Sequence, residues 1–165
     1  GSGSNGNLVQ GVNGLTGELG QLPVPDRETS DGPITTCHCK QHGCLEKSAS
    51  GPALARLYHY IMGADATAET IAERAHAGDA EAISVLDSFY TTLAKAMIPI
   101  ICMFDPDVIV VSGGLNNLPR MYDLIPQRWG HYALRPDLKT KLLPAKHGAL
   151  SGLRGAAWLG HNLHQ

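Results

Sequence analysis

The sequence of 165 residues predicts one domain with an α/β fold. An apolar stripe at helical spacing runs through residues 80–104 and stops at Asp105-Pro106-Asp107. Four β-branched residues follow at Val108–Val111, and this run breaks at Ser112-Gly113-Gly114. A helical, a strand-like and a second helical segment come next. The order helix, strand, glycine turn, helix, strand, helix is typical of an α/β domain.

The first part of the chain predicts ordered loop rather than helix. Residues 1–33 are rich in glycine, proline and asparagine, and a strand end is expected only at Leu8-Val9. A helix is predicted to start at Ser50, with Pro52 in its first turn, and to end at Gly63. A second, mostly polar helix is predicted over residues 66–77.

The third predicted helix is the longest. Asp79 can cap its first turn, and Pro99 is expected to kink it. The apolar positions that share one face are Ile83, Leu86, Tyr90, Leu93, Met97, Ile100 and Phe104.

The second half predicts two strands and two further helices. Val108–Val111 is typical of a buried strand in a parallel sheet. A helix is expected to open at Asn116 or Asn117 and to run to about Leu134. Residues 141–143 predict a weaker strand, and a last helix is expected from Ser151 to about Asn162.

Composition narrows the class of function. Net charge is −2 and 17% of the residues are charged, so a large basic field for nucleic acid or an anionic membrane is not expected. No apolar run reaches about 18 residues, because Pro99 and Asp105-Pro106 interrupt the longest, and we expect no membrane span. We also expect no signal peptide, which favours a reducing cytoplasm.

The cysteines are grouped in a way that predicts a metal site. Cys37, Cys39 and Cys44 have the spacing C-x-C-x4-C, and thiolates are preferred ligands of Zn²⁺. His38 or His42 could complete a tetrahedron. The alternative is a loop that carries three reduced cysteines without metal. Either way, a zinc-binding loop over about residues 34–46 is the hypothesis to test.

Two glycine turns and two carboxylates are candidate binding residues. The turn Ser112-Gly113-Gly114 after a strand allows the close approach of a nucleotide, or it serves packing alone. Residues 1–6, GSGSNG, could wrap a phosphate or form a linker. Glu18 and Glu46 lie in glycine-framed loops, where a carboxylate can bind paired sugar hydroxyls or remain solvated.

Several motifs, in order along nearly the whole chain, resemble those of the ROK family of sugar kinases and sugar-responsive repressors. Residues 37–46, CHCKQHGCLE, resemble the family signature C-x-C-G-x-x-G-C-x-E. Residues 14–20, GLTGELG, resemble its G-x-x-G-E-x-G-H segment, and residues 105–114, DPDVIVVSGG, resemble its D-P-[DE] strand and glycine turn. Residues 146–157 resemble its closing motif. The fructokinase/mannokinase and N-acetylglucosamine kinase branches are the nearest in pattern.

The resemblance implies an actin-like, ribonuclease-H-like fold, of which residues 1–165 would be the C-terminal half only. It also implies roles for individual residues. Glu18 and Glu46 match sugar-binding glutamates, and Gln21 stands where the family has a histidine that binds both zinc and sugar. The remaining matches are Cys37, Cys39 and Cys44 to zinc ligands, Gly1, Ser2 and Gly3 to a phosphate loop, and Gly113 and Gly114 to the adenosine-side turn.

The implied activity is transfer of a phosphoryl group from ATP, with Mg²⁺, to a hexose or N-acetylhexosamine hydroxyl. Nothing matches the family's D-x-G-G-T motif or its catalytic aspartate, so no catalytic residue is expected here and the chain alone is expected to be inactive. The alternatives are the sugar-sensing domain of a ROK repressor or a catalytically dead binding module. The protein is expected to form a homodimer in the cytoplasm. Residues 1–165 are expected to bind neither a membrane nor nucleic acid.

Overall fold

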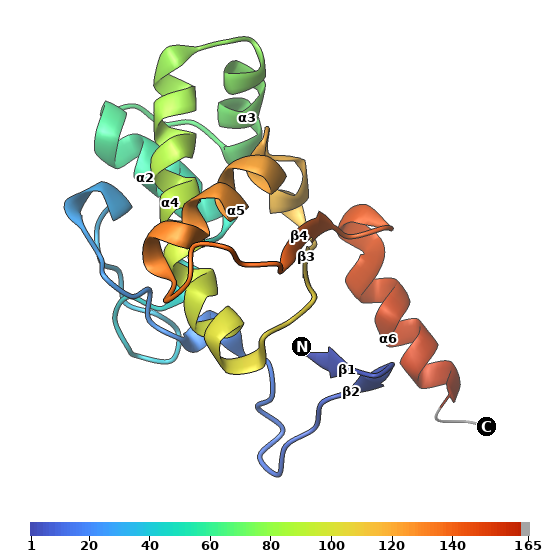
Figure 1. Ribbon diagram of the computed structural model, residues 1–165. Helices are drawn as coiled ribbons and strands as arrows, with labels where there is room; N and C mark the ends of the chain where they lie inside the picture. Colours follow the sequence, from blue (N-terminus) through green and yellow to red (C-terminus); the bar gives the residue numbers. More distant parts are fainter. Residues whose placement is uncertain (163–165) are drawn as a thin grey trace.

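The computed structural model describes residues 1–162 and places a helical body beside a small parallel sheet (Figure 1). Helix α4 (Ala80–Phe104) runs through the body, and α2 (Gly51–Met62), α3 (Ala68–His76) and α5 (Met121–Tyr132) pack against it. The core forms where these helices meet. Its largest fully buried side chains include Trp129, Tyr58, Tyr90, Phe89, Leu54, Ile71, Met121 and Ile125.

Helix α2 has the ends that its sequence predicts. The Ser50 hydroxyl accepts a hydrogen bond from the backbone N–H of Ala53 at 3.3 Å, and Pro52 occupies the first turn. Gly63 ends the helix in the left-handed conformation with φ 68°.

Helix α4 also confirms its predicted boundaries. The Asp79 carboxylate accepts from the N–H groups of Glu81 and Ala82, and Asp105 ends the helix with φ 41°. Within the described residues, α4 is the one helix that is long and apolar enough to cross a membrane. Of its most apolar 18-residue window, 61% is buried inside the protein, which is typical of a core helix. Pro99 lies inside α4, and the kink expected there stays a prediction.

The sheet pairs β3 (Val108–Val111) with β4 (Lys141–Pro144) in parallel register, so both predicted strands are confirmed. The expectation that the first strand is buried is wrong, since none of its four residues is buried. Val108 and Val110 are 41% and 56% exposed, while Ile109 and Val111 pack against the core. The described sheet has only two strands, and α5 packs against β4, so one face of the pair remains exposed.

The helix predicted to open at Asn116 or Asn117 begins later, at Met121, and ends at Tyr132 rather than Leu134. Residues Gly114–Asn117 form a 3₁₀ helix instead. Pro119 explains the delay, because a proline disfavours helical backbone at the residue before it, and Leu118 is extended.

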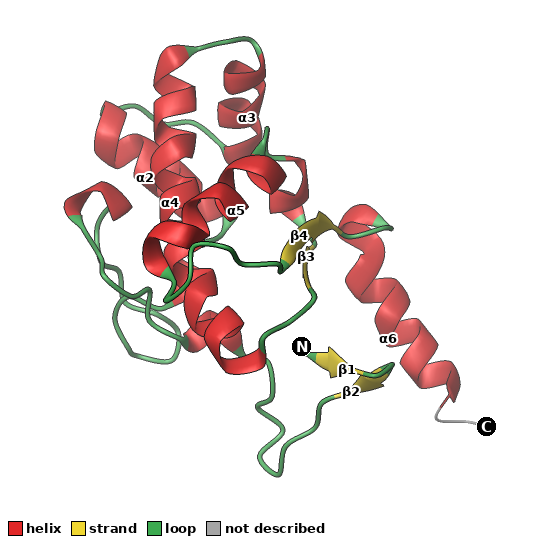
Figure 2. Cartoon of the chain, viewed as in Figure 1, coloured by secondary structure: helices red, strands yellow, loops and turns green. Residues whose placement is uncertain are grey.

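The N-terminal hairpin and the last helix both lie outside the helical body in Figure 1. Near the N-terminus, β1 (Gly3–Ser4) and β2 (Asn7–Leu8) form an antiparallel hairpin across Asn5 and Gly6, both at positive φ. The strand expected at Leu8-Val9 is therefore found one residue earlier. The last helix, α6 (Ser151–Asn162), matches its prediction and projects away from the body (Figure 2). Residues 163–165 of the expected domain lie outside the described residues.

Candidate metal centre and flanking loops

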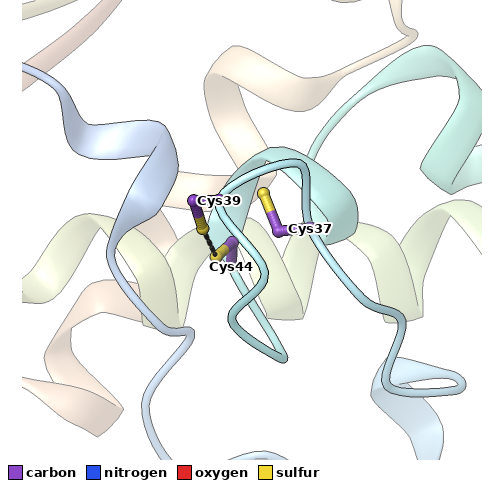
Figure 3. Close-up of side chains that lie close together, drawn as sticks. All are labelled: Cys37, Cys39 and Cys44. Atoms are coloured by element: carbon purple, nitrogen blue, oxygen red, sulfur yellow. Dashed lines mark hydrogen bonds between the residues drawn. The ribbon is translucent and has the colours of Figure 1, made fainter.

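The three grouped cysteines lie on one tight loop that leads into the short helix α1 (Leu45–Ser48) (Figure 3). The backbone N–H of Cys37 donates to Gln41 O at 2.8 Å, and the N–H of Lys40 donates to Cys37 O at 2.9 Å. Gly43 adopts φ 75°, which favours glycine. These turns bring Cys44 back beside the first two cysteines.

The sulfur atoms are placed as a metal would need them. All three Sγ atoms lie within 4.8 Å of one another, and those of Cys39 and Cys44 are 3.5 Å apart. Cys37 and Cys44 are buried, and no sulfur in the group is in a disulfide. Zinc–sulfur bonds of about 2.3 Å in a tetrahedron separate the sulfurs by about 3.8 Å. The donor set and its spacing therefore fit a zinc ion.

The thiols differ in acidity. The backbone N–H of Cys39, by hydrogen bonding, lowers the pKa of Cys37 below its usual value. Burial, and then the neighbouring thiols of Cys39 and Cys37, raise the pKa of Cys44 to about 12. Without a cation, the loop therefore keeps the Cys44 thiol protonated at neutral pH.

The two local histidines do not complete the centre. His38 is exposed, with Nε2 3.5 Å from Lys47 Nζ, and His42 is exposed, with Nδ1 3.4 Å from Thr36 Oγ1. Among the described residues, the group of close metal-ligating side chains contains the three cysteines alone. The predicted use of His38 or His42 as a fourth ligand is therefore not seen.

Gln21 lies on the segment that flanks Cys44. It ends the 3₁₀ helix Leu19–Gln21 and is exposed. The carbonyl of the next residue, Leu22, accepts a hydrogen bond from the N–H of Leu45 at 2.8 Å. Pro23 and Cys44 pair as an isolated antiparallel β-bridge. The segment that carries Gln21, the residue matched to a fourth zinc ligand, therefore runs alongside the cysteine loop.

The two predicted sugar-binding glutamates come from adjoining segments. Glu18 precedes the 3₁₀ helix and Glu46 lies in the first turn of α1, and both are exposed. A Cβ at Gly20 would lie 3.4 Å from Glu46 Cβ and 3.8 Å from Glu46 Oε2, so the two segments lie side by side. Glu18 also borders an open groove of about 440 Å³, which Leu15 and Phe104 help to line.

The predicted phosphate segment lies beside the Glu18 segment. The Gly1 amine is 3.4 Å from Gly17 O, and a Cβ at Gly17 would lie 2.6 Å from Gly1 Cα. The structure therefore brings together Gly1 and the residue before Glu18, which are 16 positions apart in sequence. Gly3 belongs to the β1–β2 hairpin and is exposed, and Ser2 precedes it.

Gly113 and Gly114 occupy the carboxyl end of β3, as predicted for a nucleotide turn. Gly113 adopts φ 85°, and a Cβ at either glycine would meet no other atom within 4 Å. Asn116 fixes the turn, because its Oδ1 accepts from the Tyr122 hydroxyl at 2.8 Å and from Ala145 N–H at 3.3 Å. The space over the two glycines is open to a ligand.

Sequence reasoning missed a buried polar cluster next to the cysteine loop. Lys95 and Thr92 of α4 and Asp31 of the preceding segment are all buried. The Thr92 hydroxyl donates to Asp31 Oδ1 at 2.6 Å, and Lys95 Nζ lies 3.3 Å from Asp31 Oδ2. The signal was present in the sequence as a single lysine within an otherwise apolar stretch of helix.

The chain is an α/β domain, in which a β3–α5–β4 unit lies beside a helical body. Its three-cysteine loop brings together Cys37, Cys39 and Cys44, a group that we call the metal-type centre because it could hold a metal ion. The profile of the ROK family matches residues 1–162, and the chain belongs to this family. The predicted resemblance is confirmed.

Solved structures confirm the actin-like fold. The ROK hexokinase from Thermus thermophilus matches with a TM-score of 0.72 and 29% identity, over 92% of this chain and 49% of that one. A ROK family glucokinase from Streptomyces griseus, in complex with glucose and AMPPNP, matches with a TM-score of 0.78 and 25% identity, over 93% of this chain and 54% of that one.

Curated relatives include N-acetyl-D-glucosamine kinases. Those of Pectobacterium atrosepticum and Photobacterium profundum are 34% and 35% identical over 159 residues, which is 94% of this chain and 52% of each relative. The chain thus spans about half the length of the curated relatives it matches.

Proposed function

We propose that residues 1–165 form the C-terminal half of a ROK-type sugar kinase that transfers the γ-phosphoryl group of ATP to a hexose or N-acetylhexosamine. The observation that carries the proposal is the three-cysteine centre flanked by the Glu18 and Glu46 segments, within a chain of the ROK family. The names of the relatives, which are N-acetyl-D-glucosamine kinases and a glucokinase, support this substrate class.

In this proposal, Cys37, Cys39 and Cys44 hold a zinc ion in the loop 34–46. Its contribution is structural, because three thiolates and a fourth ligand close the coordination sphere and fold the loop. The loop in turn fixes Glu46 at the start of α1, and the pairing of Leu22 with Leu45 holds the Gln21 segment alongside.

The carboxylates of Glu18 and Glu46 would accept hydrogen bonds from sugar hydroxyls, and Gln21 would contact the same sugar. Gly1, Ser2 and Gly3 would lie against phosphate, and the open turn of Gly113 and Gly114 would receive the nucleoside. No residue of this chain is assigned as the base, so the 165-residue chain alone is expected to show no sugar phosphorylation. Mg²⁺ would accompany ATP in the whole enzyme.

The first experiment measures zinc content and then sugar binding. About one zinc per chain is expected by elemental analysis, followed by calorimetric titration with N-acetylglucosamine and glucose. Glu46→Gln and Glu18→Gln should abolish the heat of binding, since an amide cannot replace a carboxylate that accepts from two hydroxyls. Glu69→Gln, an exposed change on α3, is the matched control. Unchanged sugar binding in both site variants would contradict the assignment.

A second function has a specific observation in its favour. A ROK family transcriptional regulator matches 85% of this chain with a TM-score of 0.65 and 25% identity. In that case this domain would sense a sugar without phosphorylating it, or would act only as an assembly module. A protein that joins this chain to its natural upstream sequence would distinguish them: sugar-dependent ADP release supports the kinase, and sugar-dependent DNA binding supports the regulator. A cytoplasmic homodimer remains part of the proposal.

A further inference from the structure

Lys95 is a charged side chain in the middle of the core helix α4 and is 1% exposed. Its ammonium donates to Asp26 O at 2.9 Å, to Glu28 Oε2 at 3.2 Å and to Asp31 Oδ2 at 3.3 Å. It also lies 5.7 Å from the centre of the Tyr132 ring. Every partner but Tyr132 belongs to the segment 26–31, which precedes the cysteine loop.

Asp31 is the matching buried anion. One carboxylate oxygen accepts from the Thr92 hydroxyl, and the other accepts from the N–H of Glu28 at 2.7 Å and from Lys95. Burial alone lowers the pKa of Lys95, but hydrogen bonds to Glu28 and Asp31 outweigh it and raise that pKa. Since a buried charge that loses its partner is strongly unfavourable, the pair fixes segment 26–31 on α4.

The same segment is bonded to the metal-type centre on its other side. Arg27 donates to Ser48 Oγ at 2.7 Å and to Gly32 O at 2.9 Å. The Ser48 hydroxyl in turn donates to Cys44 O at 3.4 Å. The backbone adds a link, because Val24 N–H donates to Gly43 O at 3.3 Å. A continuous path of polar contacts thus connects Lys95 to Cys44.

We propose that Lys95 and Asp31 are positioning residues for the three-cysteine centre, and that α4 sets the geometry of the cysteine loop through segment 26–31 and Arg27. This inference rests on the proposed metal-binding function of the loop. In it, the charge pair does more than stabilise the fold, because it holds Cys44 where its sulfur can meet those of Cys37 and Cys39.

The test is a Co²⁺ titration of the purified 165-residue chain, read from the thiolate-to-cobalt absorption bands. Lys95→Met and Asp31→Asn should each weaken Co²⁺ binding by about 10- to 100-fold, the usual effect of groups that orient metal ligands. The double variant should bind no more weakly than the worse single variant, because both act through one contact. Lys146→Met, an exposed lysine on another segment, should leave the titration unchanged.

Two milder variants keep the test decisive if Lys95→Met does not fold. Thr92→Val removes one hydrogen bond to Asp31, and Ser48→Ala removes the acceptor of Arg27. Circular dichroism must show each variant folded before titration, and both should still weaken Co²⁺ binding and shift the absorption bands.

Folded variants with wild-type affinity and bands would overturn the inference and leave the metal site standing. Failure of the wild-type chain itself to bind Co²⁺ would overturn the proposed metal function, and the inference with it.

Discussion

Cys44 shows how the cysteine loop and a metal ion depend on each other. The thiol is 1% exposed and its neighbours are two further thiols, so its ionisation is opposed both by burial and by the charge of any thiolate beside it. A divalent cation reverses that preference, because it binds the thiolate form directly. Metal binding at this site must therefore expel a proton.

The affinity of the chain for Zn²⁺ is expected to rise with pH between 6 and 8. The pKa of Cys44 near 12 means that its thiol is protonated throughout this range in the metal-free chain. Each proton displaced then contributes about a tenfold gain in apparent affinity per pH unit. Competition with a chromophoric chelator in buffers of matched ionic strength measures this slope. A pH-independent affinity would mean that the cation does not bind through the thiolates of this group.

Gln21→His is expected to tighten Zn²⁺ binding. Imidazole is a common zinc ligand and a carboxamide is a poor one, and residue 21 ends the segment that pairs with Leu45 beside Cys44. A gain of about tenfold or more is expected, comparable to the effect of groups around metal ligands. Gln21→Ala is the control and should not tighten binding. Equal affinities in all three proteins would show that residue 21 cannot reach the metal.

Helix α4 supports both the core and the cysteine loop, so the stability of its first turn matters for both. Asp79 caps the helix and also pairs with Arg74 at 2.6 Å, and Arg74 further contacts the Tyr58 hydroxyl of α2. The hydrogen bond from Ala82 N–H, followed by that from Arg74, lowers the pKa of Asp79. The cap therefore stabilises the fold while Asp79 is ionised.

Asp79→Ala is expected to lower the melting temperature at pH 7 by several degrees, because the cap and the ion pair are both lost. The difference from wild type should shrink as the pH falls through the lowered pKa of Asp79, since the protonated wild-type side chain loses the same interactions. Thermal unfolding at several pH values measures this. Ser84→Ala, an exposed change on the same helix, is the control. A difference that does not depend on pH would contradict the role of the ionised cap.

The elements that the sequence predicted correctly have their boundaries encoded locally. Ser50 and Gly63 bound α2, and Asp79 caps α4, with all the contacts lying within a few residues. The start of α5 was mispredicted because Pro119 outweighs the two asparagines before it. The hydrogen-bond partners of Lys95 could not be predicted, since they lie 64 to 69 positions earlier in the chain.

The candidate site was predictable only in part for the same reason. Spacing alone indicated that Cys37, Cys39 and Cys44 would meet, and the structure places them together. That Gly1 would lie beside Gly17, and Gly20 beside Glu46, depends on tertiary folding of glycine-rich loops that carry no periodic signal. The exposure of β3 was likewise beyond prediction, because β-branched composition does not reveal how many elements cover a strand.

Burial is uneven across the protein. The body formed by α2, α3, α4 and α5 contains the core, whereas α6 projects from it (Figure 1). Leu153 and Trp158 on α6 are 71% and 64% exposed, and Val110 of β3 is 56% exposed. Apolar surface of this extent commonly drives association, with a gain of about 25 cal/mol for each Å² removed from water.

The chain is therefore expected to self-associate as its concentration rises, and α6 is expected to contribute. Replacing Leu153 and Trp158 together by serine should lower the weight-average mass measured by sedimentation at the highest concentrations. Because both side chains are exposed, the melting temperature at low concentration should change little. Leu134→Ser, which alters a 98% exposed leucine outside α6, is the matched control and should leave association unchanged. An equal reduction by the control would show that general surface hydrophobicity, and not α6, drives the association. A wild-type chain that stays monomeric at every concentration would contradict the expected dimer.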